Sequence, residues 1–319
     1  MNEIVVLRSA RWEVGVLPNN GASVAYGRAL VGQEWRDVMR PTPADLLTDN
    51  DSTASYPLVP WSNRIEDARL VVDGTTYQLS RSFADGTAIH GTARRYPWTV
   101  VERTGSSIRM QFSSAGLVGV NWPWQFSSEI TYTVDGDALT WTTSVTNDDT
   151  VSWPAGFGHH PYFQRRVLAD PAVLHTPGAL GYPAVGCLPT GPAATPRPDA
   201  DFTSPRPVGD AFVDDIYDLR DATGPVTLDY PDADLRVTIT QDALYGHLVV
   251  YVPTDADILA VEPVTNVNNA FALAAQGETG TGLFVLEPGE TRTASFTLAL
   301  GPIPAPALDD DAESLTAAR

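Results

Sequence analysis

The chain of 319 residues is 43% hydrophobic and strongly acidic, with 20 basic residues against 39 acidic ones and a formal net charge of −19. This charge balance disfavours nucleic acid and anionic membrane surfaces as partners, because binding to either depends on Lys and Arg that neutralise phosphates. All 20 basic residues are arginine, which excludes Schiff-base chemistry on a lysine and a phosphate-loop lysine.

The single cysteine, Cys187, excludes an intramolecular disulfide and a cysteine-cluster zinc site. It lies in a Pro/Gly-rich stretch without a CxxC partner, so a structural thiol is the simpler interpretation. The first residues lack the basic segment and apolar run of a secretory signal, and no stretch approaches the ~20 apolar residues that span a bilayer. We therefore expect a soluble, cytoplasmic protein whose oligomeric state the sequence leaves open.

Most of the sequence alternates between apolar and polar residues with period two, the signature of strands with one buried face. In chain order, strands are predicted at 4–7, 98–102, 107–112, 226–228, 235–240, 248–252, 258–261, 283–286 and 293–300. Two hairpins with Asp-Gly turns are predicted, one over 70–79 and one over 129–145. Helical periodicity is nearly absent, and only short turns at 43–47 and 269–275 are predicted.

Many short strands, 25 Gly and 26 Pro indicate an all-β sandwich or barrel. Residues 171–207 hold nine prolines and few strand-like runs, so they are either an interdomain linker or a long excursion across the sheet. The excursion is the better interpretation, because strand patterning resumes at Phe212 with the same character. We expect one domain over residues 1–301 and a flexible acidic tail over 302–319.

Five histidines can exchange protons near neutral pH: His90, His159, His160, His175 and His247. Adjacent strand residues point to opposite faces, so only one of His159 and His160 enters a given pocket. His160 is the better candidate, because Pro161 holds it extended at a strand end. His90, before Gly91, is a second strand-end candidate, and the contexts of the remaining two are weaker.

Glu262 ends the apolar run Ile258–Val261, so a carboxylate stands where the pattern requires burial. Burial of an ionised carboxylate costs free energy unless the group is paired, and burial raises its pKa toward the range of a general base. Asp214 and Asp215 open another predicted strand, and Arg64 stands among apolar residues where a stacked or bidentate arginine fits. No His-x-His, HExxH or calcium-loop spacing is present, so no metal site is predicted.

The chain resembles the aldose 1-epimerase (galactose mutarotase) family over about residues 10 to 300. The resemblance is carried by ordered motifs: Asn63-Arg64-Ile65, His90-Gly91, His160-Pro161-Tyr162-Phe163, Asp214-Asp215-Ile216-Tyr217, Val261-Glu262-Pro263-Val264-Thr265 with Asn269-Ala270, and Leu286-Glu287-Pro288-Gly289-Glu290. Each motif alone is common, but their order and spacing are typical of the family. The resemblance implies the family's fold, a large antiparallel β-sandwich of the galactose mutarotase-like supersandwich type with a sugar pocket on its concave face.

The resemblance also implies roles for individual residues. His160 would be the general acid and Glu262 the base, while His90 and Arg64 would hold the sugar and Asp214 its ring hydroxyls. The reaction would interconvert the α and β anomers of a free aldohexose by ring opening and reclosure, without metal or other cofactor. For this relay we expect His160 and Glu262 to face each other across a gap the width of a pyranose ring.

The chain departs from the family pattern at Gln164-Arg165, which replaces the usual Asn-Leu, and Pro161 and Glu262-Pro263 indicate a divergent subgroup. Four tryptophans offer flat faces for sugar rings, although core packing is the commoner use of any one of them: Trp61, Trp98, Trp122 and Trp124.

Three other functions remain open. A hexose-6-phosphate 1-epimerase of the same fold would use the same His and Glu, with Arg94 and Arg95 for the phosphate. A non-catalytic carbohydrate-binding module would keep the aromatic residues but tolerate loss of His160 or Glu262. A glycoside hydrolase or lyase requires two carboxylates around the scissile bond, and only Glu262 has a persuasive setting.

Overall fold

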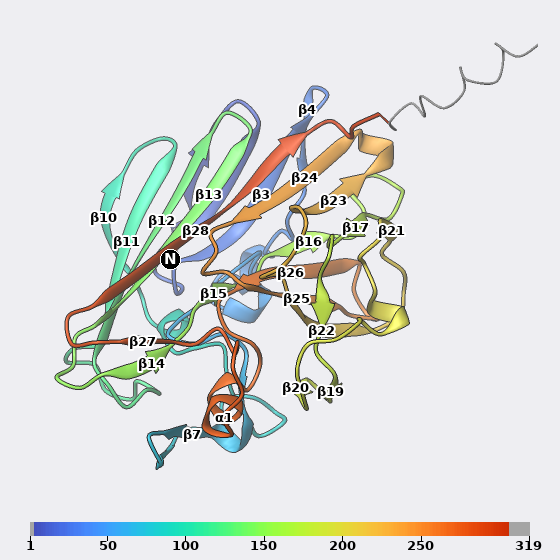
Figure 1. Ribbon diagram of the computed structural model, residues 1–319. Helices are drawn as coiled ribbons and strands as arrows, with labels where there is room; N and C mark the ends of the chain where they lie inside the picture. Colours follow the sequence, from blue (N-terminus) through green and yellow to red (C-terminus); the bar gives the residue numbers. More distant parts are fainter. Residues whose placement is uncertain (1–2, 306–319) are drawn as a thin grey trace, which may run out of the picture.

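The computed structural model describes residues 3–305, which form antiparallel sheets and confirm the predicted all-β sandwich (Figure 1). The one α-helix of this range, α1 (Ala270–Ala275), confirms the predicted turn at 269–275. The other helical segments are short 3-10 turns: η1 (Ala44–Leu46), η2 (Asn50–Ser52), η3 (Glu66–Ala68), η4 (Ala93–Arg95), η5 (Pro198–Ala200) and η6 (Pro231–Ala233). Residues 306–319 of the predicted acidic tail lie outside the described residues.

The larger layer is a nine-stranded antiparallel sheet. Its strand order is β10 (Thr99–Arg103), β11 (Ser107–Ser113), β12 (Phe126–Asp135), β13 (Ala138–Asn147), β28 (Thr291–Gly301), β24 (Leu235–Gln241), β23 (Val226–Tyr230), β17 (Val173–His175) and β21 (Arg206–Pro207). Buried and half-buried residues alternate along β12 and β13, so this sheet has one apolar face. The predicted hairpin over 129–145 is confirmed.

The second layer is a seven-stranded sheet. It contains β18 (Leu180–Gly181), β22 (Val213–Asp218), β25 (His247–Val252), β26 (Ile258–Val264), β15 (Gly158–His159) and β5 (Pro57–Leu58), and β16 (Tyr162–Gln164) also pairs with β26. Nearly every residue of β25 and β26 is buried, because both faces of these central strands are covered. Glu262 is therefore a carboxylate in the middle of a buried strand.

A four-stranded sheet packs against β12 of the nine-stranded sheet: β1 (Val5–Arg8), β2 (Trp12–Leu17), β3 (Ser23–Val31) and β4 (Glu34–Asp37). The last three were not predicted, and β2 shows why: all its residues are buried, so its sequence does not alternate. Four two-stranded pairs complete the structure: β6 (Arg64–Ile65) with β9 (Ala88–Ile89), β7 (Arg69–Val72) with β8 (Thr75–Gln78), β14 (Trp153–Ala155) with β27 (Phe284–Leu286), and β19 (Ala184–Val185) with β20 (Leu188–Pro189).

The two main sheets pack face to face at the centre of the core. In Figure 1, β15, β25 and β26 lie beneath β13, β28 and β24. Trp141 of β13 and Phe296 of β28 contact the ring of His159 on β15, with centroid distances of 5.0 and 5.6 Å. Since consecutive strand residues alternate, the next side chain, His160, is directed away from this core.

The proline-rich segment 171–207 contributes short strands to both main sheets. It adds β17 to the nine-stranded sheet through pairing with β23, and β18 to the seven-stranded sheet through pairing with β22. Its prolines interrupt the alternation that would have revealed these short strands. The single domain over residues 1–301 stays a prediction, and strands shared with both sheets favour it.

Truncation of Phe296 tests the contact between the two layers. We expect Phe296→Ala to lower the free energy of unfolding by about 3–5 kcal/mol, because the ring is fully buried against Trp141, His159 and Tyr245. Thr297→Ala on the same strand is the control. It removes only a hydrogen bond to Thr140 on the outer face and should cost about 1 kcal/mol. Urea denaturation measures both, and equal losses would contradict this packing.

Candidate active site

The site is built around a contact between an imidazole and a carboxylate. His160, which follows β15, and Glu262, from the middle of β26, lie with Nε2 and Oε1 3.2 Å apart, and both are buried. The expectation of a pyranose-wide gap between them was wrong. Both side chains leave neighbouring strands on the same face of the seven-stranded sheet, so they lie side by side. A ligand must therefore lie over the pair.

Two tyrosine rings hold the imidazole of His160. The Tyr162 ring stacks on it with centroids 4.4 Å apart, and the Tyr56 ring lies 4.9 Å away on a tilted plane. The backbone N–H of His160 donates to the carbonyl of Tyr56 at 3.1 Å, which fixes the direction of the side chain. Among the described residues, no partner is present for Nδ1 of His160 or Oε2 of Glu262, although both atoms are buried. Unsatisfied atoms at the edge of a cavity are available to a ligand.

Burial moves the proton affinities of the pair in opposite directions. Desolvation raises the pKa of Glu262 well above its ordinary value, nearby Asp214 adds to this, and Arg64 opposes it. Desolvation also lowers the pKa of His160 well below its ordinary value, with further lowering by Arg40 and Arg94. The carboxylate thus becomes a stronger base and the imidazolium a stronger acid.

His90 lies beside the pair in a strained backbone conformation. Its ring centroid is 5.2 Å from that of His160, nearly perpendicular to it, and its φ of +61° lies in the left-handed region. Gly91 follows with φ of +66°, and a Cβ there would lie 2.1 Å from the carbonyl oxygen of Val59. This close backbone approach explains the His-Gly pair: only glycine lets the chain pass Val59 and present His90 to the cavity.

Arg64 is held by carboxylates rather than left free. Its Nε donates to Asp85 at 2.9 Å, and its Nη2 lies 3.7 Å from Asp214 Oδ2. The Cys187 thiol donates to the same Asp214 oxygen at 2.8 Å. Burial raises the pKa of Asp214, while the thiol hydrogen bond and Arg64 oppose the rise. Burial and the Asp214 carboxylate raise the pKa of Cys187 to about 12, so the thiol is a hydrogen-bond donor and not a reactive thiolate.

These groups line one cavity of about 480 Å³, a usual size for a small-molecule site. All five residues that the sequence predicted for the site contribute to it: Arg64, His90, His160, Asp214 and Glu262. Aromatic rings complete the wall: Tyr56, Phe83, Tyr162, Phe212 and Tyr251. Within residues 3–305, no three His, Cys, Asp or Glu side chains are grouped to hold a metal ion.

Some candidates lie elsewhere. Trp61, Trp98, Trp122 and Trp124 are buried in the core and do not line the cavity, so core packing is their use. His175 lies in β17, and His247 is buried with Nδ1 2.8 Å from the Thr265 carbonyl. Neither lines the cavity.

Sequence reasoning missed Tyr56 as the partner of His160, because it lies about a hundred residues earlier without any distinguishing motif. Tyr162, the other partner, was part of a motif without being given a role. Only the pairing of β5 with β15 brings Tyr56 to the imidazole. Arg94 lies with its guanidinium 4.6 Å from the Tyr56 ring.

His159 is the structural member of the histidine pair. Its Nε2 lies 2.7 Å from the Thr143 hydroxyl inside the core, and burial lowers its pKa to about 3. The alternation of side chains along the strand therefore separates two adjacent histidines into a packed core residue and a cavity residue.

Comparison with known proteins supplies the family. The family model described as aldose 1-epimerase matches residues 7–299. The chain belongs to this family. In Figure 1, the strands that carry or directly precede His160, Asp214 and Glu262 lie in one sheet: β15, β22 and β26.

Relatives with similar sequence or fold extend this result. The uncharacterized protein YihR of Escherichia coli (strain K12) is 26% identical over 246 residues, which cover 76% of this chain and 77% of that protein. A galactose mutarotase-like protein from Clostridium acetobutylicum superposes with a TM-score of 0.82 at 17% identity, covering 95% and 96% of the two chains. The GalM/aldose epimerase homologue from C. elegans has a TM-score of 0.80 at 17% identity, covering 95% and 100%. These two structures show the shared fold.

No helix among residues 3–305 is long and apolar enough to cross a membrane.

Replacement of His159 tests whether the buried imidazole is held in its neutral form. An unfolded histidine takes up a proton near pH 6.5, whereas folded His159 takes one up only near pH 3, so it destabilises the fold as pH falls between these values. Between pH 7 and pH 5, wild type should lose about 2 kcal/mol more stability than His159→Gln. Urea denaturation at both pH values measures the difference. Parallel pH dependence of the two proteins would show that His159 is not held neutral.

Proposed function

We propose that the protein is an aldose 1-epimerase that interconverts the anomers of a free, unphosphorylated sugar. The observation that carries the proposal is the contact between His160 and Glu262, which are 3.2 Å apart at the wall of a cavity. Ring opening of a hemiacetal needs one group that takes the proton of the O1 hydroxyl and one that gives a proton to O5. Because O1 and O5 are bonded to the same carbon, the two catalytic groups must lie side by side.

In the proposed reaction, the Glu262 carboxylate removes the proton from O1 while His160 Nε2 donates a proton to O5. The O1 lone pair forms the carbonyl as the C1–O5 bond breaks. Rotation about the C1–C2 bond then presents the other face of the aldehyde. The O5 hydroxyl attacks that face, returns its proton to His160, and O1 takes the proton held by Glu262. The pair ends as it began, without cofactor or net change in charge.

The pKa shifts strengthen both catalytic groups, although the same shifts lower the fraction of the pair that is present as carboxylate and imidazolium. A buried carboxylate with a raised pKa is a stronger base, and an imidazolium whose pKa is lowered by burial and by Arg40 and Arg94 is a stronger acid. His90 lies close enough to His160 to donate to the sugar near the reacting oxygens. Arg64 and Asp214 lie further along the cavity, where a guanidinium and a carboxylate suit ring hydroxyls.

The charges of the cavity favour a neutral sugar over a sugar phosphate. The two arginines that line it are already paired, Arg94 with Asp51 at 2.6 Å and Arg64 with Asp85 and Asp214. Arg95 is exposed and does not line the cavity. A phosphate would have to displace a carboxylate from one of these arginines and would then lie close to the displaced carboxylate, which repels it.

Polarimetry on freshly dissolved α-glucose and α-galactose tests the reaction. Wild type should accelerate the approach to anomeric equilibrium, and His160→Ala and Glu262→Gln should each lower kcat by about 10² to 10⁴. Far-UV circular dichroism of both variants controls for folding. Glucose 6-phosphate should be a poorer substrate than glucose. No acceleration with any unmodified aldose would refute the proposal, and a preference for the phosphate ester would favour the phosphosugar alternative.

The substitution His90→Asn tests whether His90 binds the sugar or only stabilises the fold. Asparagine tolerates the left-handed backbone conformation of His90, so the variant should fold, but it lacks the reach of the imidazole. We expect a higher KM and a kcat lowered by about tenfold, with the melting temperature within a few degrees of wild type. A large fall in melting temperature with unchanged KM would instead make His90 a structural residue.

A further inference from the structure

A second cavity of about 600 Å³ adjoins the candidate active site. The two cavities share three lining residues, Cys187, Phe212 and Asp214, whereas His160 and Glu262 line only the first. The second cavity therefore continues the first on its Asp214 side, away from the groups that exchange protons. A ligand whose reacting end lies at His160 and Glu262 would extend into it.

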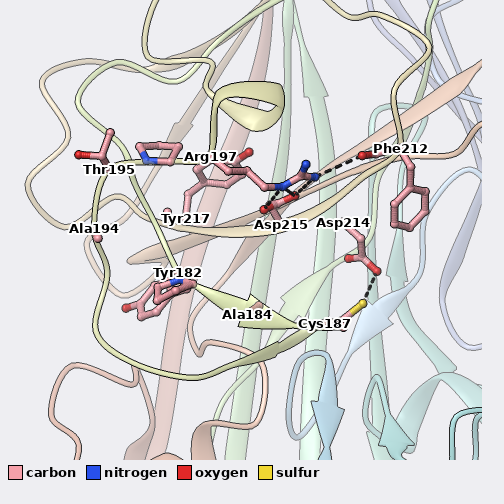
Figure 2. Close-up of a pocket in the computed structure, with 14 residues that line it drawn as sticks. Tyr182, Ala184, Cys187, Ala194, Thr195, Arg197, Phe212, Asp214, Asp215 and Tyr217 are labelled. Carbon is pink, nitrogen blue, oxygen red and sulfur yellow. Dashed lines mark hydrogen bonds and ion pairs between the residues drawn. The ribbon is translucent and has the colours of Figure 1, made fainter.

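The second cavity lies where the edge of the seven-stranded sheet is open. β18 pairs with β22 only at Tyr217 and Asp218, and among the described residues no strand pairs with Val213 to Asp215 on that side. The segment 181–197 leaves the sheet there, forms the β19–β20 hairpin, and returns to Gly181 through a bridge with Ala194. In Figure 2, Cys187 of this hairpin lies beside Asp214. Asn268 donates to the backbone carbonyl of Cys187 at 2.9 Å and so fixes the hairpin to the loop between β26 and α1.

The polar groups of this cavity suit hydroxyls and not an anion. Arg197 makes two-pronged hydrogen bonds to Asp215, with Nη2 2.7 Å from Oδ2 and Nε 2.9 Å from Oδ1. Arg197 is the one cation among the lining residues, and its charge is neutralised by this pair. Such a pair presents both donors and acceptors without net charge, as sugar hydroxyls require. Asp214 adds a further carboxylate, which opposes a phosphate or carboxylate ligand.

An exposed aromatic ring marks the boundary between the two cavities. The side chain of Phe212 is 53% exposed and touches the rest of the wall through an edge-to-face contact with Tyr251 at 6.0 Å. In Figure 2 its ring lies beside Asp214. An exposed flat ring next to hydroxyl-binding groups is suited to the apolar face of a pyranose. The second cavity is also at least as large as the first, so it has room for a ring of the same size.

We infer that the second cavity is a subsite for a second sugar unit, and that the substrates are reducing disaccharides or longer reducing glycans. This inference rests on the proposed function, since it places the reducing unit at His160 and Glu262. The non-reducing unit then lies between Phe212 and the Arg197–Asp215 pair. The glycosidic bond passes Asp214 and Cys187, and it is neither formed nor broken.

Polarimetry with glucose, maltose, lactose and melibiose tests the subsite, because glucose is the reducing unit of all three disaccharides. Wild type should have a kcat/KM about tenfold higher for at least one disaccharide than for glucose. Ala184→Trp places a large ring in the second cavity at an exposed position that does not line the first. It should remove the preference for the disaccharide and change kcat/KM for glucose by less than about twofold.

Val185→Trp is the matched control. Val185 is the next residue of β19, is 75% exposed, and lines neither of the two cavities, so this variant should behave as wild type. The subsite would be overturned if glucose were turned over at least as well as every disaccharide, or if the two tryptophan variants behaved alike. Neither result would contradict the proposed function.

Binding measurements test the subsite independently of the reaction. Methyl glycosides of glucose and of the three disaccharides cannot open their rings, so isothermal titration calorimetry measures their binding without turnover. We expect about tenfold tighter binding of one disaccharide glycoside, lost in Ala184→Trp and kept in Val185→Trp. If no sugar is turned over, the proposed function fails, and these affinities alone decide whether the subsite exists. Equal affinities for the mono- and disaccharide glycosides would overturn it.

Discussion

The structure depends on the burial of a carboxylate beside an imidazole. Glu262 lies in the middle of β26, where the strands on either side and the cavity wall remove it from water. Transfer of an isolated carboxylate into such a place is costly, and the cost appears as a raised pKa instead of a free charge. His160 shares that environment at 3.2 Å, so a single proton can be held between the two groups.

A backbone contact also positions the neighbours of the pair. Asn63 and His90 both have positive φ, and the His90 N–H donates to the Asn63 carbonyl at 3.0 Å. Two strained residues that hydrogen-bond to each other persist only where the surrounding sheets determine their positions. The strain is thus stored where β6 and β9 meet, and it directs Arg64 and His90 toward the same cavity.

Charge pairing explains how an acidic chain can bind an uncharged ligand. Each of Arg64, Arg94 and Arg197 is bound to aspartate, so the walls of both cavities present fixed donors and acceptors with little positive charge. Asp214 lines both cavities, and its Oδ2 accepts a hydrogen bond from the Cys187 thiol at 2.8 Å and lies 3.7 Å from Arg64 Nη2, within ion-pair distance. The lone cysteine therefore contributes as a neutral donor, which its high pKa preserves.

The sequence by itself determined the all-β class, the main hairpins, the different roles of His159 and His160, and the five polar residues that line the cavity. The strands, His160 and Glu262 follow from local properties, since alternation of side chains is set by the strand backbone and Glu262 interrupts an apolar run. The choice of Asp214 over Asp215 came from the resemblance to the family. The tertiary structure alone decided that Glu262 touches His160, that Tyr56 packs on that imidazole, and that segment 171–207 adds strands to both sheets. Such contacts join residues about a hundred positions apart, and pairing between distant strands leaves no periodic signal in either segment.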